Sequence, residues 1–461
     1  MYQRYHIETG SAPDIVPALG RFRVKVKKIG LAGLILKEIV HYRGNWTVVL
    51  SRPCMYGVFS GPVGGFAPRE HLCVGCLRCT TQYPEFVQVS PNPERLRQGD
   101  SFFSPDYVDA FYYEARNGKI PVRGAGYRGP FGGAGWDGMW TDMSEIVRPT
   151  RDGIHGREFI STAVDIGSKP AFLAFDDQGR PTNDPVRTIS LPLPMLLDSP
   201  PASLLSQKLV EALRRAAEET ETLLILPIQA IQQFGVSSRV AVPLVKPGDE
   251  ARLDRLSFAP AMIELDGWHQ QFYERVRKRL PEGSISLRLA AGSSEELANY
   301  VRAGVRIFHV TPNYHGRWPD GRFVLDLIRD THRAFLDLGC RDEVTLLGSG
   351  GIILAEHVAK SIICGLDAVA LDTPVLVALQ AEFLGECVDR ATSQFRLPTA
   401  LTVPWAAQRV KNLLGSWRDQ LLEIMGAMGI REVRRLRGEI GRAMFQKDLE
   451  REAFAGIEGY V

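Results

Sequence analysis

Four of the seven cysteines lie between Cys54 and Cys79, and three of these are evenly spaced. Cys73, Cys76 and Cys79 follow the pattern C-x2-C-x2-C, with which thiolates from one tight loop can reach three irons of a cubane cluster. In the four-cysteine form of this motif the last cysteine comes four residues later, but this chain has Tyr83 there. Cys54 is the nearby substitute, so we predict a 4Fe-4S cluster on all four cysteines.

Three alternatives remain for this cysteine group. A 3Fe-4S cluster needs only the three evenly spaced thiolates, and a structural zinc ion uses four cysteines with similar short spacings. The third alternative is that the cysteines bind no metal and are ordinary buried residues of the core. Disulfides are not expected, because the other three cysteines are scattered and we predict a reducing compartment.

A glycine turn in the second half of the chain has the residue types of a phosphate site. An apolar run, Val344–Leu347, enters Gly348-Ser349-Gly350-Gly351, and a helical pattern follows over Ala355–Cys364. The next apolar run ends in Asp372-Thr373. Glycines let backbone N–H groups approach an anion, and the following helix directs its positive dipole end at the same place. The alternative is an ordinary turn between a strand and a helix.

These residues must be positioned by a regular framework, and the chain from Ser190 onward supplies one. Eight apolar runs alternate with helical patterns, which predicts an α/β fold of the (β/α)8 TIM barrel class with its active site at the carboxyl ends of the strands. The glycine turn then follows strand seven, where barrels commonly bind phosphate. The predicted strands are Leu191–Leu197, Thr222–Leu226, Arg239–Val245, Ala261–Leu265, Ser284–Leu289, Val305–Val310, Val344–Leu347 and Ala368–Leu371.

We predict four regions along the chain. Residues 1–105 form an N-terminal segment with the cysteine cluster, in which Phe22–Val26 and Trp46–Leu50 are expected as strands and Leu31–Val40 as helix. Residues 106–186 form a glycine-rich connector that either wraps over a cofactor or only joins the parts. The barrel occupies 187–395. Residues 396–461 form a helical tail, including the arginine-rich stretch 431–444.

Composition sets limits on the class of protein. The 461 residues are 45% hydrophobic and 23% charged, with a net charge of +2, as in ordinary globular proteins. Basic residues are dispersed, so nucleic acid is not an expected partner. No signal peptide pattern or membrane span is evident, and we predict a cytoplasmic protein.

The segment from Gly348 to Thr373, the strand Met262–Leu265 and the tail 410–438 resemble the FMN-binding domain of the glutamate synthase family. The likeness is to its short members that carry a ferredoxin-type cysteine motif before the barrel. This resemblance implies FMN as cofactor, with its phosphate held by the turn and the strand-eight end, and Arg288 beside the flavin where the family has lysine. The cofactor-binding candidates are Arg288, Gly348, Ser349, Gly350, Gly351, Asp372 and Thr373.

The chain also departs from that family. The loop after strand four, which serves the substrate in glutamate synthases, is reduced to Asp266-Gly267-Trp268. Of three spaced cysteines after strand eight, only Cys387 is present. Arg288 cannot act as a proton donor as lysine can, because its guanidinium stays protonated. His315, after strand six, is a candidate acid or base, with a surface histidine as the alternative.

The resulting expectation is an FMN- and iron–sulfur-containing oxidoreductase that works on a small-molecule substrate with a redox partner. A homo- or hetero-oligomer is compatible with this expectation. Two other functions stay open. One is a non-catalytic electron-transfer or scaffolding subunit. The other is a true glutamate synthase, although the departures predict that the chain forms no glutamate.

Overall fold

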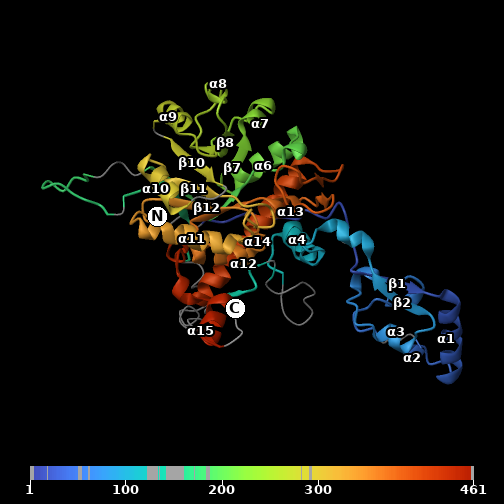
Figure 1. Cartoon of the computed structure of the whole chain (residues 1–461). Helices are drawn as coiled ribbons and strands as arrows, with labels where there is room; N and C mark the ends of the chain where they lie inside the picture. Colours follow the sequence, from blue (N-terminus) through green and yellow to red (C-terminus); the bar gives the residue numbers. More distant parts are fainter. Residues whose placement is uncertain are drawn as a thin grey trace. The chain divides into compact units, whose positions relative to one another are not determined.

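A computed structural model describes most of the chain as two compact units, which we treat separately (Figure 1). The first comprises residues 1–15, 110–122 and 130–461, and the second comprises residues 16–109 and 123–129. Several stretches of the predicted connector 106–186 lie outside the described residues, and so do Leu50 and both chain ends. The described residues are 5–17, 19–49, 54–60, 63–121, 133, 135–141, 160–170, 172–182, 187–281, 283–289 and 293–457.

The first unit is built on a closed barrel of eight parallel strands in the order β10-β11-β12-β13-β6-β7-β8-β9. All eight predicted strands form, which confirms the (β/α)8 class. Their side chains are almost all buried, because the barrel interior covers one face and helices cover the other. The strands are β6 (Met195–Leu197), β7 (Leu224–Pro227), β8 (Ala241–Val245), β9 (Met262–Asp266), β10 (Ser284–Leu289), β11 (Ile307–Val310), β12 (Thr345–Gly348) and β13 (Ala368–Leu371).

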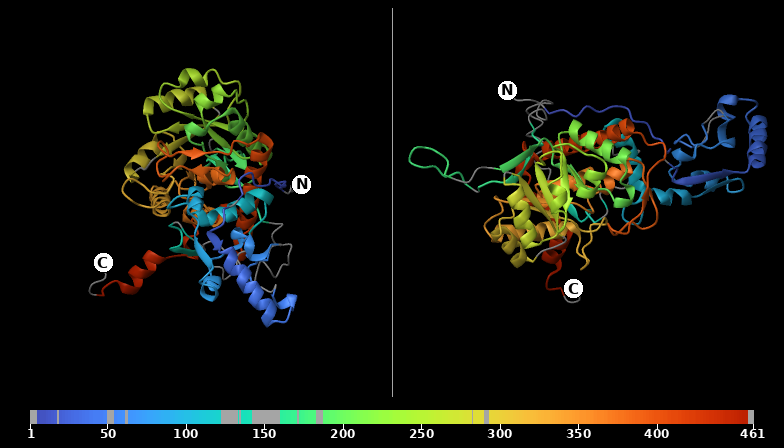
Figure 2. Two further views of the ribbon diagram at one scale, coloured as in Figure 1. Left: turned by 90° about the vertical axis from the view of Figure 1, so that its right-hand side faces the viewer. Right: turned by 90° about the horizontal axis from the view of Figure 1, so that it is seen from above.

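Helices surround the strands, as the three views together show (Figures 1 and 2). Their starts follow local capping chemistry. Ser206 caps α6 through the Leu209 N–H, and Ser293 and Glu296 form a capping box at α10. The helices between strands are α6 (Gln207–Glu219), α7 (Ile228–Gln233), α8 (Glu250–Leu253), α9 (Gln270–Arg279), α10 (Ser294–Arg302), α11 (Val324–Asp337) and α12 (Ala355–Cys364), followed by α13 (Thr373–Ala378).

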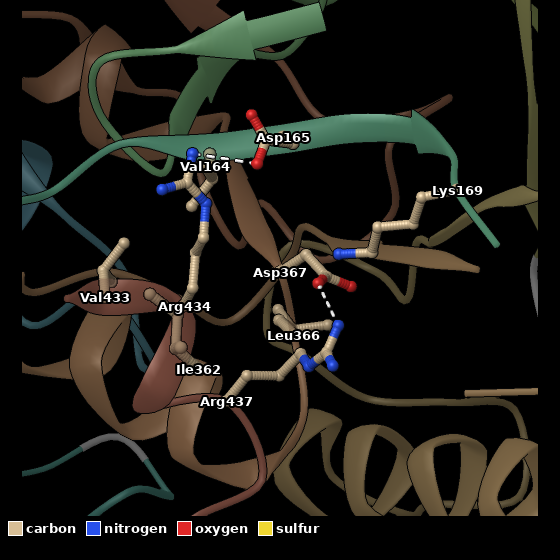
Figure 3. A pocket seen from close by; sticks show the side chains of 9 residues that line it. All are labelled: Val164, Asp165, Lys169, Ile362, Leu366, Asp367, Val433, Arg434 and Arg437. Atoms are coloured by element: carbon tan, nitrogen blue, oxygen red, sulfur yellow. Dashed lines mark hydrogen bonds and ion pairs between the residues drawn. The ribbon is translucent and has the colours of Figure 1, made fainter. Parts of the chain in front are cut away.

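The amino end of the barrel is closed by an antiparallel hairpin, β4 (Val164–Ser168) with β5 (Arg187–Leu191). Thr345, which begins β12, accepts a hydrogen bond from the Gly167 N–H and donates one to the Gly167 carbonyl, both at 3.0 Å. Beside the hairpin is a small cavity of about 50 Å³ with charged walls, including Lys169, Asp367 and Arg437 (Figure 3). This end is therefore packed rather than open.

The chain after the barrel returns across its outside. Two short strands, β14 (Glu382–Phe383) and β15 (Phe395–Arg396), flank an excursion that carries Arg390. Helix α14 (Val403–Met428) then packs on α6 and α12. Its Arg409 is fully buried and donates to the Ala12 carbonyl at 3.0 Å and to Asp14 at 2.8 Å. The N-terminal residues are thereby fixed to the C-terminal helix.

The arginine-rich stretch 431–444 is not a continuous helix, which corrects the prediction. It forms short 3-10 turns at Val433–Arg435 and Ile440–Arg442, then β16 (Ala443–Phe445), which pairs with β3 (Met139–Thr141). Gly438 breaks the helix with φ of +73°, and a side chain there would collide with His332. Helix α15 (Gln446–Phe454) ends the described chain.

The second unit is a small two-stranded fold. Strand β1 (Phe22–Val26) pairs antiparallel with β2 (Val87–Pro91), and helices α1 (Lys28–His41) and α3 (Arg78–Gln82) lie between them in sequence. The expected strand from Trp46 is wrong: Trp46–Val49 forms α2, whose Val48 and Val49 N–H groups bond to the Asn45 carbonyl. A short apolar run fits either structure, and the local turn prevails here. Helix α4 (Pro105–Asn117) leads into the first unit.

Among the described residues, no helix is both long enough and apolar enough to span a bilayer.

Candidate functional site

A buried group of charged residues lies inside the barrel toward the carboxyl ends of its strands. Arg288 of β10 donates to both Glu264 of β9 and Asp198, which directly follows β6. His309 of β11 lies with its Nδ1 atom 2.9 Å from Glu264 Oε1. Glu264 and His309 have no exposed surface, and Arg288 is 9% exposed. Because buried charges are costly unless paired, this group must be held by its mutual contacts.

The strand register explains how these residues meet. Ser286 is opposite Glu264 on the neighbouring strand, and Arg288 is opposite His309. Since side chains alternate along a strand, Ser286 and Arg288 point to the same side of β10. The contacts of Arg288 with its neighbours identify that side as the barrel interior.

Three polar atoms of this interior have no hydrogen-bond partner among the described residues. They are Glu264 Oε2, Ser286 Oγ and His309 Nε2, which come from three adjacent strands. An unpaired buried polar group costs about 1 to 3 kcal/mol, so native proteins seldom keep several together without a ligand or water. This part of the barrel can therefore accept a polar molecule.

Arg390 closes the opposite side of the same mouth. Its guanidinium donates to Asp198 at 3.1 Å, to Asp372 at 2.6 Å and to the Ser349 hydroxyl at 3.0 Å. It also lies over the ring of Tyr314, 4.8 Å from the centroid. Arg390 thus connects the ends of β6, β12 and β13, and Asp198 links it to Arg288.

The acids of this network differ in their electrostatics. Burial opposes ionisation of Asp198, but Arg288 and then Arg390 hold its pKa well below the usual range. Burial also opposes ionisation of Glu264, whose pKa is nevertheless lowered by Arg288 and His309. At Asp372 burial prevails over Arg390, so its pKa is raised. Asp372 is therefore the acid in this group that is most easily neutralised.

The glycine turn has the predicted shape. Gly350 and Gly351 have φ angles of +78° and +71°, a conformation that favours glycine. A Cβ atom on Gly350 would lie 2.5 Å from the Asn313 carbonyl oxygen, so the turn is also packed closely against the loop after β11. The Gly351 N–H donates to the Tyr314 carbonyl at 3.1 Å. That donor is already used inside the protein.

Part of the glycine-rich connector covers this turn. Trp136 is fully buried and donates from Nε1 to the Gly351 carbonyl at 2.8 Å. Its ring stacks on His357 of α12 and contacts Phe323 edge to face. The described part of the connector therefore contacts the predicted phosphate region, and a role in covering a cofactor stays a prediction.

The predicted phosphate residues come together, but around a side chain of the protein itself. Asp372 Oδ1 accepts the Thr373 N–H at 2.6 Å, and Arg390 joins Asp372 to Ser349. FMN matches the mouth at its flavin end, where Arg288 and the unpartnered polar atoms lie. At the expected phosphate position, Arg390 supplies a suitable cation, but its guanidinium is already paired with the Asp372 carboxylate.

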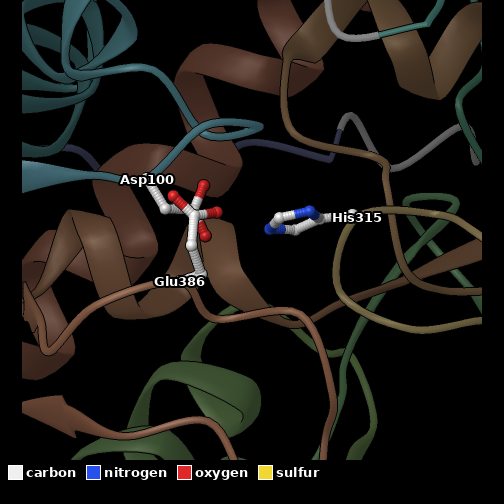
Figure 4. Close-up of side chains that lie close together, drawn as sticks. All are labelled: Asp100, His315 and Glu386. Carbon is white, nitrogen blue, oxygen red and sulfur yellow. The ribbon is translucent and has the colours of Figure 1, made fainter.

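His315 lies in the loop after β11, close to Glu386 (Figure 4). The nearest ligand atoms of the two side chains are within 4.8 Å of each other. His309, by contrast, is inside the barrel and contacts the Arg288 group. His309 is therefore the better-placed histidine for chemistry in the mouth, and the role predicted for His315 stays a prediction.

In the second unit, Cys54, Cys73, Cys76 and Cys79 all line one cavity of about 170 Å³. Apolar side chains form most of the rest of its wall, including Val24, Val58 and Phe59 of the local core. Burial, and then the adjacent Cys73 thiol, raise the pKa of Cys79. None of the seven cysteines, all of which are described, forms a disulfide.

The loop geometry explains how three of these thiols reach one cavity. Gly75 and Leu77 both have positive φ, which turns the chain twice between Cys73 and Cys79. A side chain at Gly75 would overlap the ring of Phe22 on β1, so the loop is fixed against the sheet. Cys54 reaches the cavity from a separate segment. Cysteine thiols that line one cavity are the side chains with which proteins hold an iron–sulfur cluster or a zinc ion.

Five residues of the mouth were not predicted as site residues from the sequence: Asp198, Glu264, Ser286, His309 and Arg390. The sequence did contain a signal for His309, because this polar side chain lies within the apolar strand Ile307–Val310. Alternation along the strand places it on the same face as Ile307. Asp198 follows a strand end directly, as catalytic residues in barrels do. Arg390 gave no local signal, because it comes from an irregular excursion far along the chain.

Comparison with known proteins supports the resemblance. The model of the conserved region in glutamate synthase matches residues 324–431. The chain is 23% identical to an archaeal-type glutamate synthase (NADPH) of Dehalococcoides mccartyi, over 80% of this chain and 86% of that protein. It is 24% identical to an archaeal glutamate synthase (NADPH) of Archaeoglobus fulgidus, over 85% and 89% of the two chains.

Among solved structures, a mandelate oxidase complex aligns with 65% of this chain and 98% of its own, at 15% identity and a TM-score of 0.40. A flavocytochrome b2 variant with sulfite bound aligns with 70% and 90%, at 11% identity and a TM-score of 0.42. The barrel itself is defined by the strand order given above. The sequence matches show that the chain is related to glutamate synthases, and the strand order shows that it is built on a (β/α)8 barrel.

Proposed function

We propose that this protein is an FMN-dependent oxidoreductase that also carries an iron–sulfur cluster and exchanges electrons with a redox partner. The observation that carries the proposal is the barrel mouth, where a buried arginine and three unpartnered polar atoms lie beside a glycine turn in a glutamate synthase-related chain. Bound FMN would supply the redox chemistry. A cytoplasmic, reducing location is part of the proposal, since the cysteine group needs free thiols.

The residues of the mouth would act on the flavin and on its substrate in distinct ways. Burial opposes the charge of Arg288, but Asp198 and Glu264 raise its pKa, so it stays cationic and can hold the electron-rich edge of the flavin. His309 Nε2 is free to exchange a proton, while Glu264 holds its Nδ1 side. Arg390, Ser349 and the glycine turn would bind the phosphate.

The second unit would hold the cluster through Cys54, Cys73, Cys76 and Cys79. A 4Fe-4S cluster would carry single electrons to or from a partner protein. A 3Fe-4S cluster or zinc stays an alternative for the same thiols. Zinc would remove the electron-transfer role, since it has no redox chemistry.

An absorbance spectrum and metal analysis of protein purified without oxygen test the proposal. We expect flavin bands, iron and acid-labile sulfide, with loss of iron but retention of flavin in Cys76→Ser. Flavin-free protein that takes up no added flavin contradicts an FMN enzyme. Bound flavin that no substrate or donor reduces favours the non-catalytic subunit.

Glutamate synthesis is a second candidate, because the matched relatives carry that name. Only three residues, 267–269, separate β9 from α9, which agrees with the shortened loop seen in the sequence. We predict that reduced protein supplied with 2-oxoglutarate and ammonia forms no glutamate above background. Turnover on the order of 1 per second, as in a working enzyme, would establish the family activity instead.

A further inference from the structure

Asp372 uses both of its carboxylate oxygens within the predicted phosphate region. Oδ1 accepts hydrogen bonds from the Thr373 N–H at 2.6 Å and from the Thr373 hydroxyl at 3.2 Å. Oδ2 accepts from Arg390 at 2.6 Å. The side chain is 5% exposed overall, so water does not compete for these donors.

The same donors are those that a phosphate monoester would require. Arg390 also donates to Ser349, inside the glycine turn, so its guanidinium directly joins the turn to Asp372. The Gly351 N–H is engaged with the Tyr314 carbonyl, and Arg390 and the Thr373 N–H are donors that Asp372 holds. A phosphate carries nearly two negative charges at neutral pH and would face the Asp372 carboxylate directly.

We propose that Asp372 is an internal competitor for the phosphate of FMN, holding Arg390 and the Thr373 N–H in the free protein and giving them up when the phosphate binds. This inference rests on the proposed FMN-dependent function. It assigns Arg390 as the cation that recognises the phosphate. It also predicts that the phosphate group adds little to the affinity for the flavin, whereas it would add more in a site whose phosphate donors are not already paired.

Charge distribution favours Asp372 as the residue that yields. Asp198 also contacts Arg390, but it is held by Arg288 as well and is stabilised as a carboxylate by both. Asp372 has Arg390 as its single arginine partner among the described ion pairs. Its release therefore breaks one ion pair and leaves the Arg288 group intact.

Binding of FMN and of riboflavin to the full-length protein tests this inference, because the two ligands differ only by the phosphate. We compare wild type with Asp372→Asn, which keeps the oxygen that caps Thr373 but loses the charge. Asp372→Ser is a second variant with a capping hydroxyl. Asp266→Asn is the matched control, since Asp266 ends a strand at the same mouth but pairs with Lys246.

We expect Asp372→Asn and Asp372→Ser to bind FMN at least about tenfold tighter than wild type, since removing a like charge opposite a phosphate is worth more than 1.4 kcal/mol. Riboflavin affinity should stay unchanged in all four proteins, and Asp266→Asn should match wild type for both ligands. Flavin fluorescence quenching measures each constant, and thermal unfolding confirms that the variants fold.

Unchanged or weaker FMN binding in both folded Asp372 variants overturns the inference, and so does an equal gain for riboflavin. If wild type binds riboflavin and FMN, such a result leaves the proposed function standing. If no folded protein of the set binds either flavin, the proposed function fails together with the inference. Binding of FMN by the Asp372 variants alone would show that Asp372 blocks the phosphate instead of yielding to it, which overturns the inference and the FMN-dependent function together.

Discussion

The two ends of the barrel each bury a network of arginine and acid, but only one network is complete. At the amino end, Arg341 donates to Asp367, the Val344 and Gly365 carbonyls and His332. Both oxygens of Asp367 accept hydrogen bonds. Oδ2 accepts from Arg341 and from the Leu346 N–H, and Oδ1 accepts from Arg437. At the carboxyl end, Glu264, Ser286 and His309 each keep an unpartnered atom.

This difference indicates that the network at the amino end is structural, whereas the one at the carboxyl end is suited to binding a ligand. The amino-end network ties together the starts of two strands and the tail, and the cavity beside it has a volume of about 50 Å³. A protein gains stability there by satisfying every group. Leaving groups unsatisfied at the other end costs stability, which is expected where a ligand must later supply the missing partners.

Replacing Asp367 by alanine should give the largest effect. It leaves buried Arg341 without its acid and removes one of the two acids that bind Arg437, and breaking a buried pair costs about 3 to 5 kcal/mol. Denaturant unfolding measures the loss. Asp342→Ala is the control, because Asp342 binds the same Arg437 from an exposed position and should cost less than about 1 kcal/mol. Equal effects of the two variants would mean that the amino end is not a buried network.

His332 makes the amino end sensitive to acid. Burial, and then Arg341, lower its pKa from 6.5 to about 4. Because the unfolded chain then binds a proton more readily than the folded one, stability should fall as the pH drops from 6.5 toward 4. His332→Gln keeps an acceptor for Arg341 and should flatten this part of the profile of unfolding free energy against pH. An unchanged slope would assign the acid sensitivity to other groups.

Two buried hydroxyls, those of Thr345 and Ser286, allow a direct comparison of the two ends, with the smallest expected changes in the free energy of unfolding. Thr345→Val at the amino end removes both bonds to Gly167 and should cost about 1 to 3 kcal/mol. Ser286→Ala at the carboxyl end removes an unpartnered hydroxyl and should change stability by less than about 1 kcal/mol, or raise it. Similar losses in the two variants would show that Ser286 is satisfied in solution, and the comparison of the two ends would fail at this residue.

The sequence was sufficient for the barrel because buried parallel strands are mostly apolar runs, as in β6, β7 and β13. Strand β10 instead alternates, with Ser286 and Arg288 on its interior side. It also predicted that Arg288 and the strand-eight end belong to the mouth. It could not predict that Asp372 turns its carboxylate onto Arg390, since that contact depends on where an irregular excursion places one side chain. It misassigned Trp46–Val49 because a short apolar run carries no periodicity.

Arg409 has a consequence for how the chain is made. Its bond to the Ala12 carbonyl spans 397 positions in sequence, and the paired bonds between Gly10 and Asn412 span 402. Residues 10–12 are synthesised long before residues 409–412, and these bonds cannot form until α14 has been made. Contacts of such separation form late and slow folding, so the segment around Ala12 is fixed only after the barrel strands have been synthesised. Premature termination before α14 would leave the N-terminal segment without its partners in a product open to proteolysis.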